Sequence, residues 1–250
     1  MALFGKKNCD ICGGQIGFLG NRKLEDGNMC KECGKNLSPF FSDRRRTTVA
    51  DIKTHFAYRE ANKKAVAAFN ATRTLGKRTK VYLDEDAGKF IVSAARRLAD
   101  ENPDVLAFSQ VTGCHVEVSN RKSEQTQKDK DGKPVSYNPP RYIYSYDFNV
   151  AIHVNHPWFN EIKFRVNDQS VDSAETSGGP ETGRRGSDYR ECEALANEIK
   201  DALTQIRQGV RDNIAAANKP KTAQICPICA ATTMPDAQGR CEYCGGALTV

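Results

Sequence analysis

The feature that most constrains this chain is the placement of its cysteines. Eight of the ten cysteines form two sets of paired C-x-x-C motifs, one set near each end of the 250 residues. Two cysteines separated by two residues can approach one ion from a single tight turn, and four thiolates match the tetrahedral preference of zinc. The predicted ligands are Cys9, Cys12, Cys30 and Cys33 in the first set, and Cys226, Cys229, Cys241 and Cys244 in the second.

Four thiolate ligands leave no coordination position for water or substrate, so we expect two structural Zn²⁺ ions rather than catalytic ones. Disulfides are the alternative. The chain begins without the apolar core of a signal peptide, and no stretch approaches the roughly 20 apolar residues of a transmembrane helix. The expected location is therefore the reducing cytoplasm, which favours metal over disulfides.

The charge is unevenly distributed along the chain. The formal net charge is +6, but residues 1–80 hold 17 Lys and Arg against 7 Asp and Glu, whereas the remainder holds 20 against 24. We interpret the excess as a solvated basic face, part of which lies beside the thiolates of the first set. A nucleic-acid surface is the alternative, although no segment interleaves aromatic and basic side chains as a stacking platform would.

Changes in sequence pattern divide the chain into four parts. Residues 1–40 form the N-terminal zinc module, and a turn at 25–28 is expected to follow a short hairpin of residues 15–19 and 22–24. Residues 41–78 form a helical linker, whose helix begins at a capping box of Thr48 and Asp51, runs to about Thr72 and presents Ile52, Phe56, Val66 and Phe69. Residues 79–218 form the central domain, and residues 219–250 form a C-terminal zinc ribbon.

The central domain is expected to be mainly antiparallel. Period-two alternation predicts a hairpin of Lys80–Asp84 and Lys89–Ser93, a strand at 111–118, a long strand at 142–154 and another at 162–166. The stretches 120–140 and 168–187 are expected to be loops. An amphipathic helix then begins near Asp188, continues for about 30 residues and stops at 219–221. The predicted fold class is α+β, with a β domain closed by this long helix. Cys114 and Cys192 lie on apolar faces and are expected to pack in the core.

Three resemblances add to these predictions. Cys-Asp-Ile-Cys-Gly and Cys-Lys-Glu-Cys-Gly, with the residues between them, resemble a bacterial zinc-ribbon family of unknown function. Cys-Pro-Ile-Cys and Cys-Glu-Tyr-Cys resemble the short zinc ribbon appended to many bacterial proteins, which implies nucleic-acid binding, protein docking or stabilisation. The order of strands and final helix resembles a pleckstrin-homology-like domain, which implies a curved sheet and, in some members, binding to acidic lipid headgroups.

Motifs for catalysis are absent from the sequence. There is no phosphate-binding loop, nucleophile elbow or H-E-x-x-H motif. The four histidines are scattered, although two of them could meet in space at a strand end; they are His55, His115, His153 and His156. Glu25 and Asp26 could hold magnesium at a hairpin tip, but we interpret them as turn residues. We therefore predict that the chain is not an enzyme.

The sequence favours a non-catalytic zinc-binding adaptor whose zinc modules and central β domain contact a protein partner. Two alternatives remain: nucleic-acid binding through the basic N-terminal region, and association with anionic membranes through the central domain. The sequence leaves the oligomeric state open.

Overall fold

The computed structural model describes residues 7–173, 186–217, 223–236 and 239–248. The chain divides into two compact units, Met1–Arg207 and Gln208–Val250, with the boundary inside the last helix. Helices and sheets are mixed and every paired strand is antiparallel in the described residues, which confirms the coarse fold class. No helix among the described residues is long and apolar enough to span a membrane.

The first unit begins with two small hairpins and a short helix. Strands β1 (Lys7–Asn8) and β2 (Gln15–Ile16) pair, strands β3 (Arg22–Lys23) and β4 (Asn28–Met29) pair, and helix α1 (Lys31–Lys35) follows. The predicted pairing of 15–19 with 22–24 is therefore wrong. The first C-x-x-C turn lies between β1 and β2 and brings those two strands together, while the second hairpin closes through the expected turn after β3.

Helix α2 (Val49–Ala67) follows a single 3₁₀ turn, η1 (Arg44–Arg46). The predicted capping box is present, because the N–H of Asp51 donates to Oγ1 of Thr48 at 3.2 Å and the N–H of Thr48 donates to the Asp51 carboxylate at 3.1 Å. The helix ends at Ala67 rather than near Thr72. The buried carboxylate of Asp84 accepts the N–H of Asn70 at 3.0 Å and directs the chain into the sheet.

The buried face of α2 also differs from the expected one. Its buried residues are Ile52, His55, Asn62 and Val66. Two of these are polar, and both find hydrogen-bond partners in the tertiary structure. The apolar pattern therefore predicted Ile52 and Val66 correctly, whereas Phe56 and Phe69 are only half-buried and the two polar residues were not expected.

The first sheet has the order β5-β6-β7-β8. Its strands are β5 (Arg73–Leu75), β6 (Lys80–Asp84), β7 (Lys89–Ser93) and β8 (Leu106–Ala107), with helix α3 (Leu98–Glu101) before β8 and a 3₁₀ turn η2 (Phe108–Gln110) after it. The predicted β6–β7 hairpin is confirmed with its bounds. Strand β5 corrects the predicted linker 41–78, because Arg73–Leu75 pairs with β6 and belongs to the sheet.

The second sheet has the order β11-β10-β12, with β9 also paired to β10. Its strands are β9 (Val111–Lys128), β10 (Pro134–His156), β11 (Phe159–Arg165) and β12 (Val171–Asp172). Phe148, Ile152 and Ile162 are fully buried on it, as the alternation of the sequence predicts.

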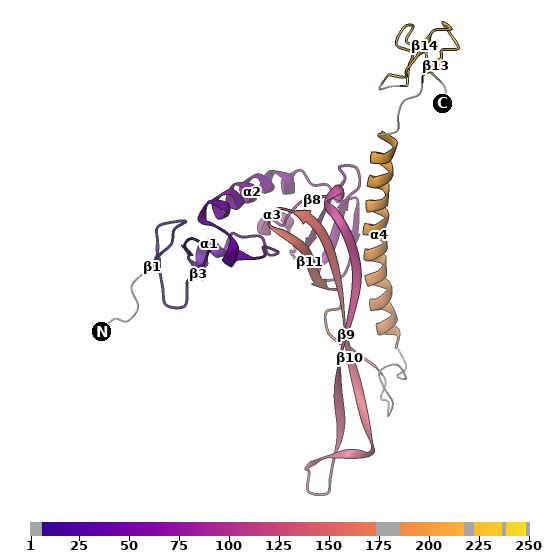
Figure 1. The fold of residues 1–250 in the computed structure, drawn as a ribbon. Helices are drawn as coiled ribbons and strands as arrows, with labels where there is room; N and C mark the ends of the chain where they lie inside the picture. Colours follow the sequence, from indigo (N-terminus) through magenta and orange to yellow (C-terminus); the bar gives the residue numbers. More distant parts are fainter. Residues whose placement is uncertain (1–6, 174–185, 218–222, 237–238, 249–250) are drawn as a thin grey trace. The chain divides into compact units, whose positions relative to one another are not determined.

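The outer part of β9 and β10 extends beyond the other strands as a two-stranded ribbon (Figure 1). The predicted loop 120–140 is therefore wrong. Both strands remain paired as far as Lys128 and Pro134, and a bulge follows Ser136. Polar residues occupy both faces of this ribbon, so the alternation that marks a strand is missing, while the inner halves of the strands fix the register. Of the other predicted loop, residues 168–173 include β12 and residues 174–185 lie outside the described part.

Helix α4 (Ser187–Ala217) confirms the predicted long helix. The ring of Tyr189 meets Tyr146 and Phe148 edge-on, with centroids 5.0 and 4.9 Å away. Ile199 and Leu203 are fully buried, whereas Ile214, farther along the predicted stripe, is 55% exposed. The predicted helix stop at 219–221 lies among residues 218–222, outside the described part. The described residues of the second unit include a small hairpin of β13 (Gln224–Ile225) with β14 (Thr232–Thr233).

Candidate metal centres

The first C-x-x-C pair lies on a tight turn between β1 and β2. The N–H of Cys9 donates to the carbonyl of Gly14 at 2.8 Å, and the N–H of Gly13 donates back to the carbonyl of Cys9 at 2.8 Å. Gly13 has φ +75°, a backbone conformation that a residue without Cβ adopts at little cost. The turn places the thiols of Cys9 and Cys12 on one side.

The second pair lies at the start of α1. Cys30 is the N-cap of this helix, and its sulfur accepts the N–H of Cys33 at 3.3 Å. The N–H of Cys30 in turn donates to the sulfur of Cys9 at 3.2 Å. A tight turn, a hairpin and a helix start therefore surround the site, which is a treble-clef arrangement rather than a ribbon with two identical turns.

The two glycines that follow the pairs have different roles. The sequence predicts the same positive φ at Gly13 and Gly34, but Gly34 continues α1 and its φ is not positive. A Cβ at Gly34 would lie 2.5 Å from Cδ of Arg22. Glycine at this position therefore makes room for the side chain of Arg22 rather than for a turn.

A compact core supports the first cluster and extends into α2. Its buried members are Cys9, Ile16, Leu24, Met29, Cys33 and Ile52. Ile52 belongs to α2 and is fully buried. The carboxylate of Asp26 also accepts the N–H of Val49, the first residue of α2, at 2.7 Å. Asp26 thus anchors a helix end, which explains its place in the sequence without a magnesium ion.

The second cluster lies between two tight turns of the same kind. The N–H of Cys226 donates to the carbonyl of Ala231 at 2.9 Å, and the N–H of Cys241 donates to that of Gly246 at 2.8 Å. Positive φ occurs in both turns, at +59° for Ala230 and +70° for Gly245. The Cβ of Ala230 makes this conformation sterically unfavourable, whereas Gly245 has no Cβ. This strain is expected at Ala230, because alanine stands there in the position that glycine occupies in the other C-x-x-C turns. Among the described residues of this module, the buried cluster consists of Cys226, Cys241 and Leu248.

The spacing of the sulfur atoms fits zinc in both clusters. In each cluster, all four sulfurs lie within 4.8 Å of one another. Tetrahedral ligation at about 2.3 Å per Zn–S bond places sulfurs about 3.8 Å apart. The measured Sγ–Sγ distances are 3.9 and 3.8 Å in the first cluster and 3.6 Å twice in the second. A disulfide needs about 2.05 Å, so these distances favour a shared metal ion.

The pKa values of the cysteines in the first cluster also favour a bound cation. Burial by itself raises the pKa of Cys9, but hydrogen bonds from the backbone N–H groups of Cys12 and Cys30 outweigh it and lower this pKa to about 6. Burial, together with the neighbouring thiols of Cys30 and Cys12, raises the pKa of Cys33 far above its ordinary value. One thiol therefore ionises readily and another does not, unless a positive ion compensates the accumulated charge.

In the second cluster, too, the pKa of one cysteine is lowered and that of another is raised. The backbone N–H of Cys229 lowers the pKa of Cys226 to about 6. The N–H of Gly246 lowers the pKa of Cys244, but the thiol of Cys229 and burial outweigh it and raise that pKa to about 12. The two clusters thus present the same donor set. Each could hold one zinc ion, and four thiolates would fill its coordination shell.

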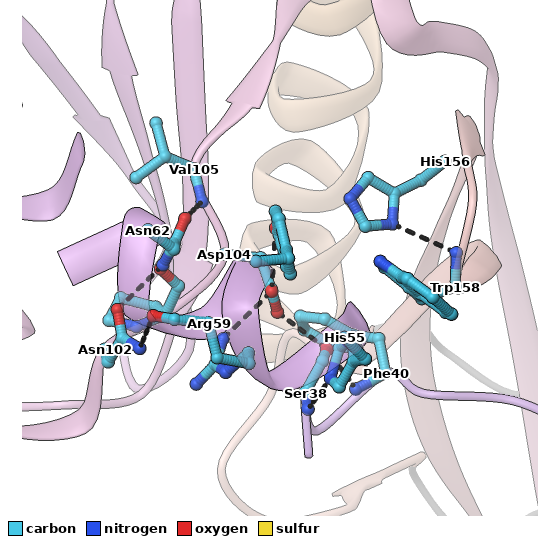
Figure 2. Close-up of polar contacts among 12 residues, drawn as sticks. Ser38, Phe40, His55, Arg59, Asn62, Asn102, Asp104, Val105, His156 and Trp158 are labelled. Atoms are coloured by element: carbon cyan, nitrogen blue, oxygen red, sulfur yellow. Dashed lines mark hydrogen bonds and ion pairs between the residues drawn. The ribbon is translucent and has the colours of Figure 1, made fainter. Parts of the chain in front are cut away.

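A buried polar network at the side of α2 was not predicted from the sequence (Figure 2). The carboxylate of Asp104, whose side chain is 0% exposed, accepts hydrogen bonds from Oγ of Ser38 at 2.7 Å, from the Tyr58 hydroxyl at 3.0 Å and from Nη1 of Arg59 at 2.9 Å. The Asn62 amide nitrogen donates to the carbonyl of Pro103 at 2.7 Å. The network fixes α2 and the preceding loop to the segment before β8. The polar residues that share one face of α2 with Ile52 and Val66 were the sequence feature that could have indicated this network.

His55 lies in the same network and is fully buried. Its Nε2 accepts the N–H of Ser38 at 3.1 Å, while its Nδ1 has no hydrogen-bond partner among the residues that the structure describes. Burial lowers the pKa of His55 to about 4, so the ring is neutral at pH 7. An enclosed and neutral ring suits packing better than proton transfer to a substrate.

His153 and His156, which could have met at the strand end, instead make separate contacts. His153 stacks on His115, with ring centroids 5.0 Å apart. His156 meets the ring of Phe159 at 4.2 Å and that of Tyr58 at 5.2 Å. The other two cysteines lie where expected. Cys114 and Cys192 are half-buried thiols, and burial raises the pKa of each, that of Cys114 to about 12.

Comparison with known proteins matches the first cluster to a family. The family model described as Domain of unknown function (DUF4428) matches residues 7–55. This span contains the first four cysteines and ends within α2, three residues after Ile52. Together with the cysteine geometry, the match supports an N-terminal zinc module of unknown function. No curated protein and no solved structure matches the chain.

Proposed function

We propose that this chain is a non-catalytic adaptor that binds a protein partner through its zinc modules. One observation carries the proposal. Of the nine large hydrophobic side chains that are exposed in the described residues, six belong to the zinc modules: Phe18, Leu19, Ile225, Ile228, Met234 and Tyr243. Exposed apolar groups gathered on a small module are typical of a protein contact surface.

The C-terminal module carries four of these six residues. Ile225 is 70% exposed, Ile228 68%, Met234 56% and Tyr243 72%. In the part of the module that the structure describes, the buried cluster has three members, and these four side chains lie outside it. A zinc ion would hold the two tight turns that present these side chains. Aromatic and Met side chains at such positions are enriched in protein interfaces.

The N-terminal module carries the other two at the turn between β2 and β3. Leu19 has φ +63° and is 92% exposed, and Phe18 beside it is 88% exposed. A left-handed conformation costs an L-residue roughly 1–2 kcal/mol. Since Leu19 makes no buried contact in exchange, a role in binding explains its presence better than a role in folding.

The absence of catalysis belongs to the same proposal. Two saturated thiolate sites would leave no position for a reacting molecule, and the described His55 ring is enclosed. The strand order followed by α4 is also consistent with a pleckstrin-homology-like domain, a type of domain that serves as a docking platform.

The proposal is tested by capturing partners with matched variants. The test variant is Ile225→Ser with Tyr243→Ser, and the control is Val135→Ser, which removes a side chain that is 37% exposed outside the zinc modules. We expect a protein that the wild type and the control retain and the double variant loses, with two zinc ions in every preparation. The same dependence should reappear with the purified partner. If every captured protein binds all three forms equally, the adaptor proposal is wrong.

A further inference from the structure

A cleft of about 420 Å³ opens between two segments that are far apart in the sequence. Residues 41–51 form one wall and residues 156–160 form the other. The N–H of Ser42 donates to the carbonyl of Trp158 at 3.2 Å, across 116 positions of sequence. The volume of the cleft lies in the range of small-ligand sites, about 300–1,000 Å³.

Aromatic rings hold one side of the cleft in place. Trp158 lies nearly parallel to Phe41, with centroids 6.1 Å apart and an interplanar angle of 19°. His55 meets Trp158 edge-on at 5.0 Å, and the same His55 is held by the buried network (Figure 2). Because these contacts fix the indole before any ligand arrives, stacking on it would require little additional ordering.

One basic residue lines the same cleft, and four others lie near it in the chain or in the neighbouring hairpin. Arg46 lines it, and Arg44 and Arg45 precede Arg46 in η1. Nη1 of Arg44 donates to the carbonyl of Lys23 at 3.4 Å, which joins η1 to β3 and its Arg22. None of these five basic residues forms an ion pair with another described residue. Burial lowers the pKa of Arg44, and the charges of Arg22 and Arg45 lower it further.

Nearby carboxylates offset part of this charge. Asp51 lines the cleft, and its carboxylate accepts the N–H and hydroxyl of Thr48, which lower its pKa and keep it ionised. The carboxylate of Asp26 accepts the N–H of Val49. Asp43 is the remaining acidic residue in the lining, and it directly precedes the three arginines. The cleft therefore combines a fixed aromatic ring with Arg46, and the arginines of η1 continue from it along the chain, while Asp43 and Asp51 offset part of their charge.

We infer that this cleft binds single-stranded nucleic acid, with a base against Trp158 and the phosphates along Arg44, Arg45 and Arg46. Base stacking on an aromatic side chain next to a basic track is the usual way in which single strands are held. The hydroxyl and amide groups in the lining, such as those of Ser42 and Asn160, suit the polar edges of a base. A duplex would keep its bases stacked and out of the cleft. This binding activity is separate from the adaptor role of the zinc modules.

The test uses the full chain with both zinc ions bound. Trp158 is the single tryptophan of the chain, so its fluorescence reports on the cleft directly. A thymine or uracil oligonucleotide of about 10 residues falls within the site sizes of roughly 4–16 nucleotides known for single-strand binders. At about 50 mM salt, we expect saturable quenching at micromolar concentrations. Three phosphate contacts predict a slope of about −2 for log K against log salt concentration.

Three variants distinguish binding in the cleft from non-specific attraction of the oligonucleotide to basic side chains elsewhere. Arg45→Ala with Arg46→Ala should weaken binding by about tenfold or more and reduce the salt slope to about −0.7. Lys128→Ala with Lys130→Ala removes the same charge from the tip of the β9–β10 ribbon and should leave binding unchanged. Asp43→Asn should strengthen binding severalfold. Asn tolerates positive φ, and Asp43 has φ +52°, so this variant should fold normally.

Several results would overturn the inference. One is equal weakening by the ribbon variant and the arginine variant, and another is equally tight binding of a duplex of the same length. A third is Trp158 quenching by vesicles of phosphatidylserine and phosphatidylcholine with no response to oligonucleotides. The last result would assign the cleft to anionic membranes instead. DNA and RNA oligonucleotides are titrated separately to identify the natural form.

Discussion

His55 and Trp158 lie 103 positions apart in the sequence, and their rings meet edge-on with centroids 5.0 Å apart. One ring belongs to α2 and the other to the turn between β10 and β11. This contact, together with the Asp104 network, fixes α2 and the segment before it to the sheet. It also makes the stability of this region depend on pH.

The first prediction concerns this pH dependence. Burial lowers the pKa of His55 to about 4 in the folded protein, below its ordinary value of 6.5. The unfolded chain therefore takes up a proton as the pH falls through 6.5, while the folded chain does so only near 4. The stability that a neutral His55 contributes is complete above pH 6.5 and is lost between 6.5 and 4. At about 1.4 kcal/mol per pH unit, the loss is about 3 kcal/mol.

Urea unfolding followed by Trp158 fluorescence at pH 7 and pH 5 measures the part of this loss that falls above pH 5, about 2 kcal/mol. The control is His55→Gln, which keeps an acceptor for the Ser38 N–H and cannot titrate. The wild type should lose more stability than the variant between the two pH values. Equal losses in both proteins would show that His55 does not cause the pH dependence.

The second prediction concerns the buried carboxylate of the network. Asp104→Asn removes the charge that pairs with Arg59, whose side chain is only 11% exposed. Removing one partner of a buried ion pair costs about 3–5 kcal/mol, because the other charge stays buried. The control is Asp100→Asn, whose exposed pair with Arg97 should contribute less than about 1 kcal/mol. Chemical denaturation of both variants compares them, and a small loss for Asp104→Asn would contradict the prediction.

The third prediction separates the two zinc modules. Cys9→Ser should remove one zinc ion per chain and loosen the first turns of α2, because Ile52 belongs to the core of that module. Cys241→Ser should also remove one zinc ion but leave α2 intact. Structural zinc contributes about 10–16 kcal/mol of apparent binding energy in small peptides. The two four-stranded sheets, β5–β8 and β9–β12, should remain folded in both variants.

Elemental analysis and hydrogen exchange of α2 measure these effects. Cys192→Ser, which changes a cysteine outside both clusters, is the control and should retain two zinc ions. Retention of two zinc ions by Cys9→Ser or Cys241→Ser would mean that the assigned ligands are wrong.

The fourth prediction tests the backbone of the C-terminal module. Ala230→Gly relieves a left-handed strain of roughly 1–2 kcal/mol and adds some freedom to the unfolded chain, so we expect about 1 kcal/mol of stabilisation. Gly245→Ala should destabilise the module. A Cβ at Gly245 would meet no atom within 4 Å, so its cost comes only from φ. Competition with a zinc chelator measures both effects, and equal zinc affinity in the two variants would disprove this explanation.

Local patterns in the sequence determined the parts of this protein that depend on neighbours along the chain. The eight cysteines gather in two clusters because C-x-x-C spacing brings two thiols to one turn. The β6–β7 hairpin, the Thr48 cap and helix α4 follow from alternation, capping and amphipathic period, which are local properties. In each of these cases the interactions join residues that are close in sequence, or residues that a metal ion would collect.

Only the tertiary structure decided the features that join distant residues. The β9–β10 ribbon has polar faces, so its pairing is set by the buried inner strands and leaves no pattern of its own. The two polar residues on the buried face of α2 form hydrogen bonds with Ser38, Pro103 and Val105, which no spacing rule connects to the helix. Trp158 and Arg46 line the same cleft because the β10–β11 turn packs against Phe41. A stacking surface that is absent from every segment of the sequence is therefore created where two segments meet.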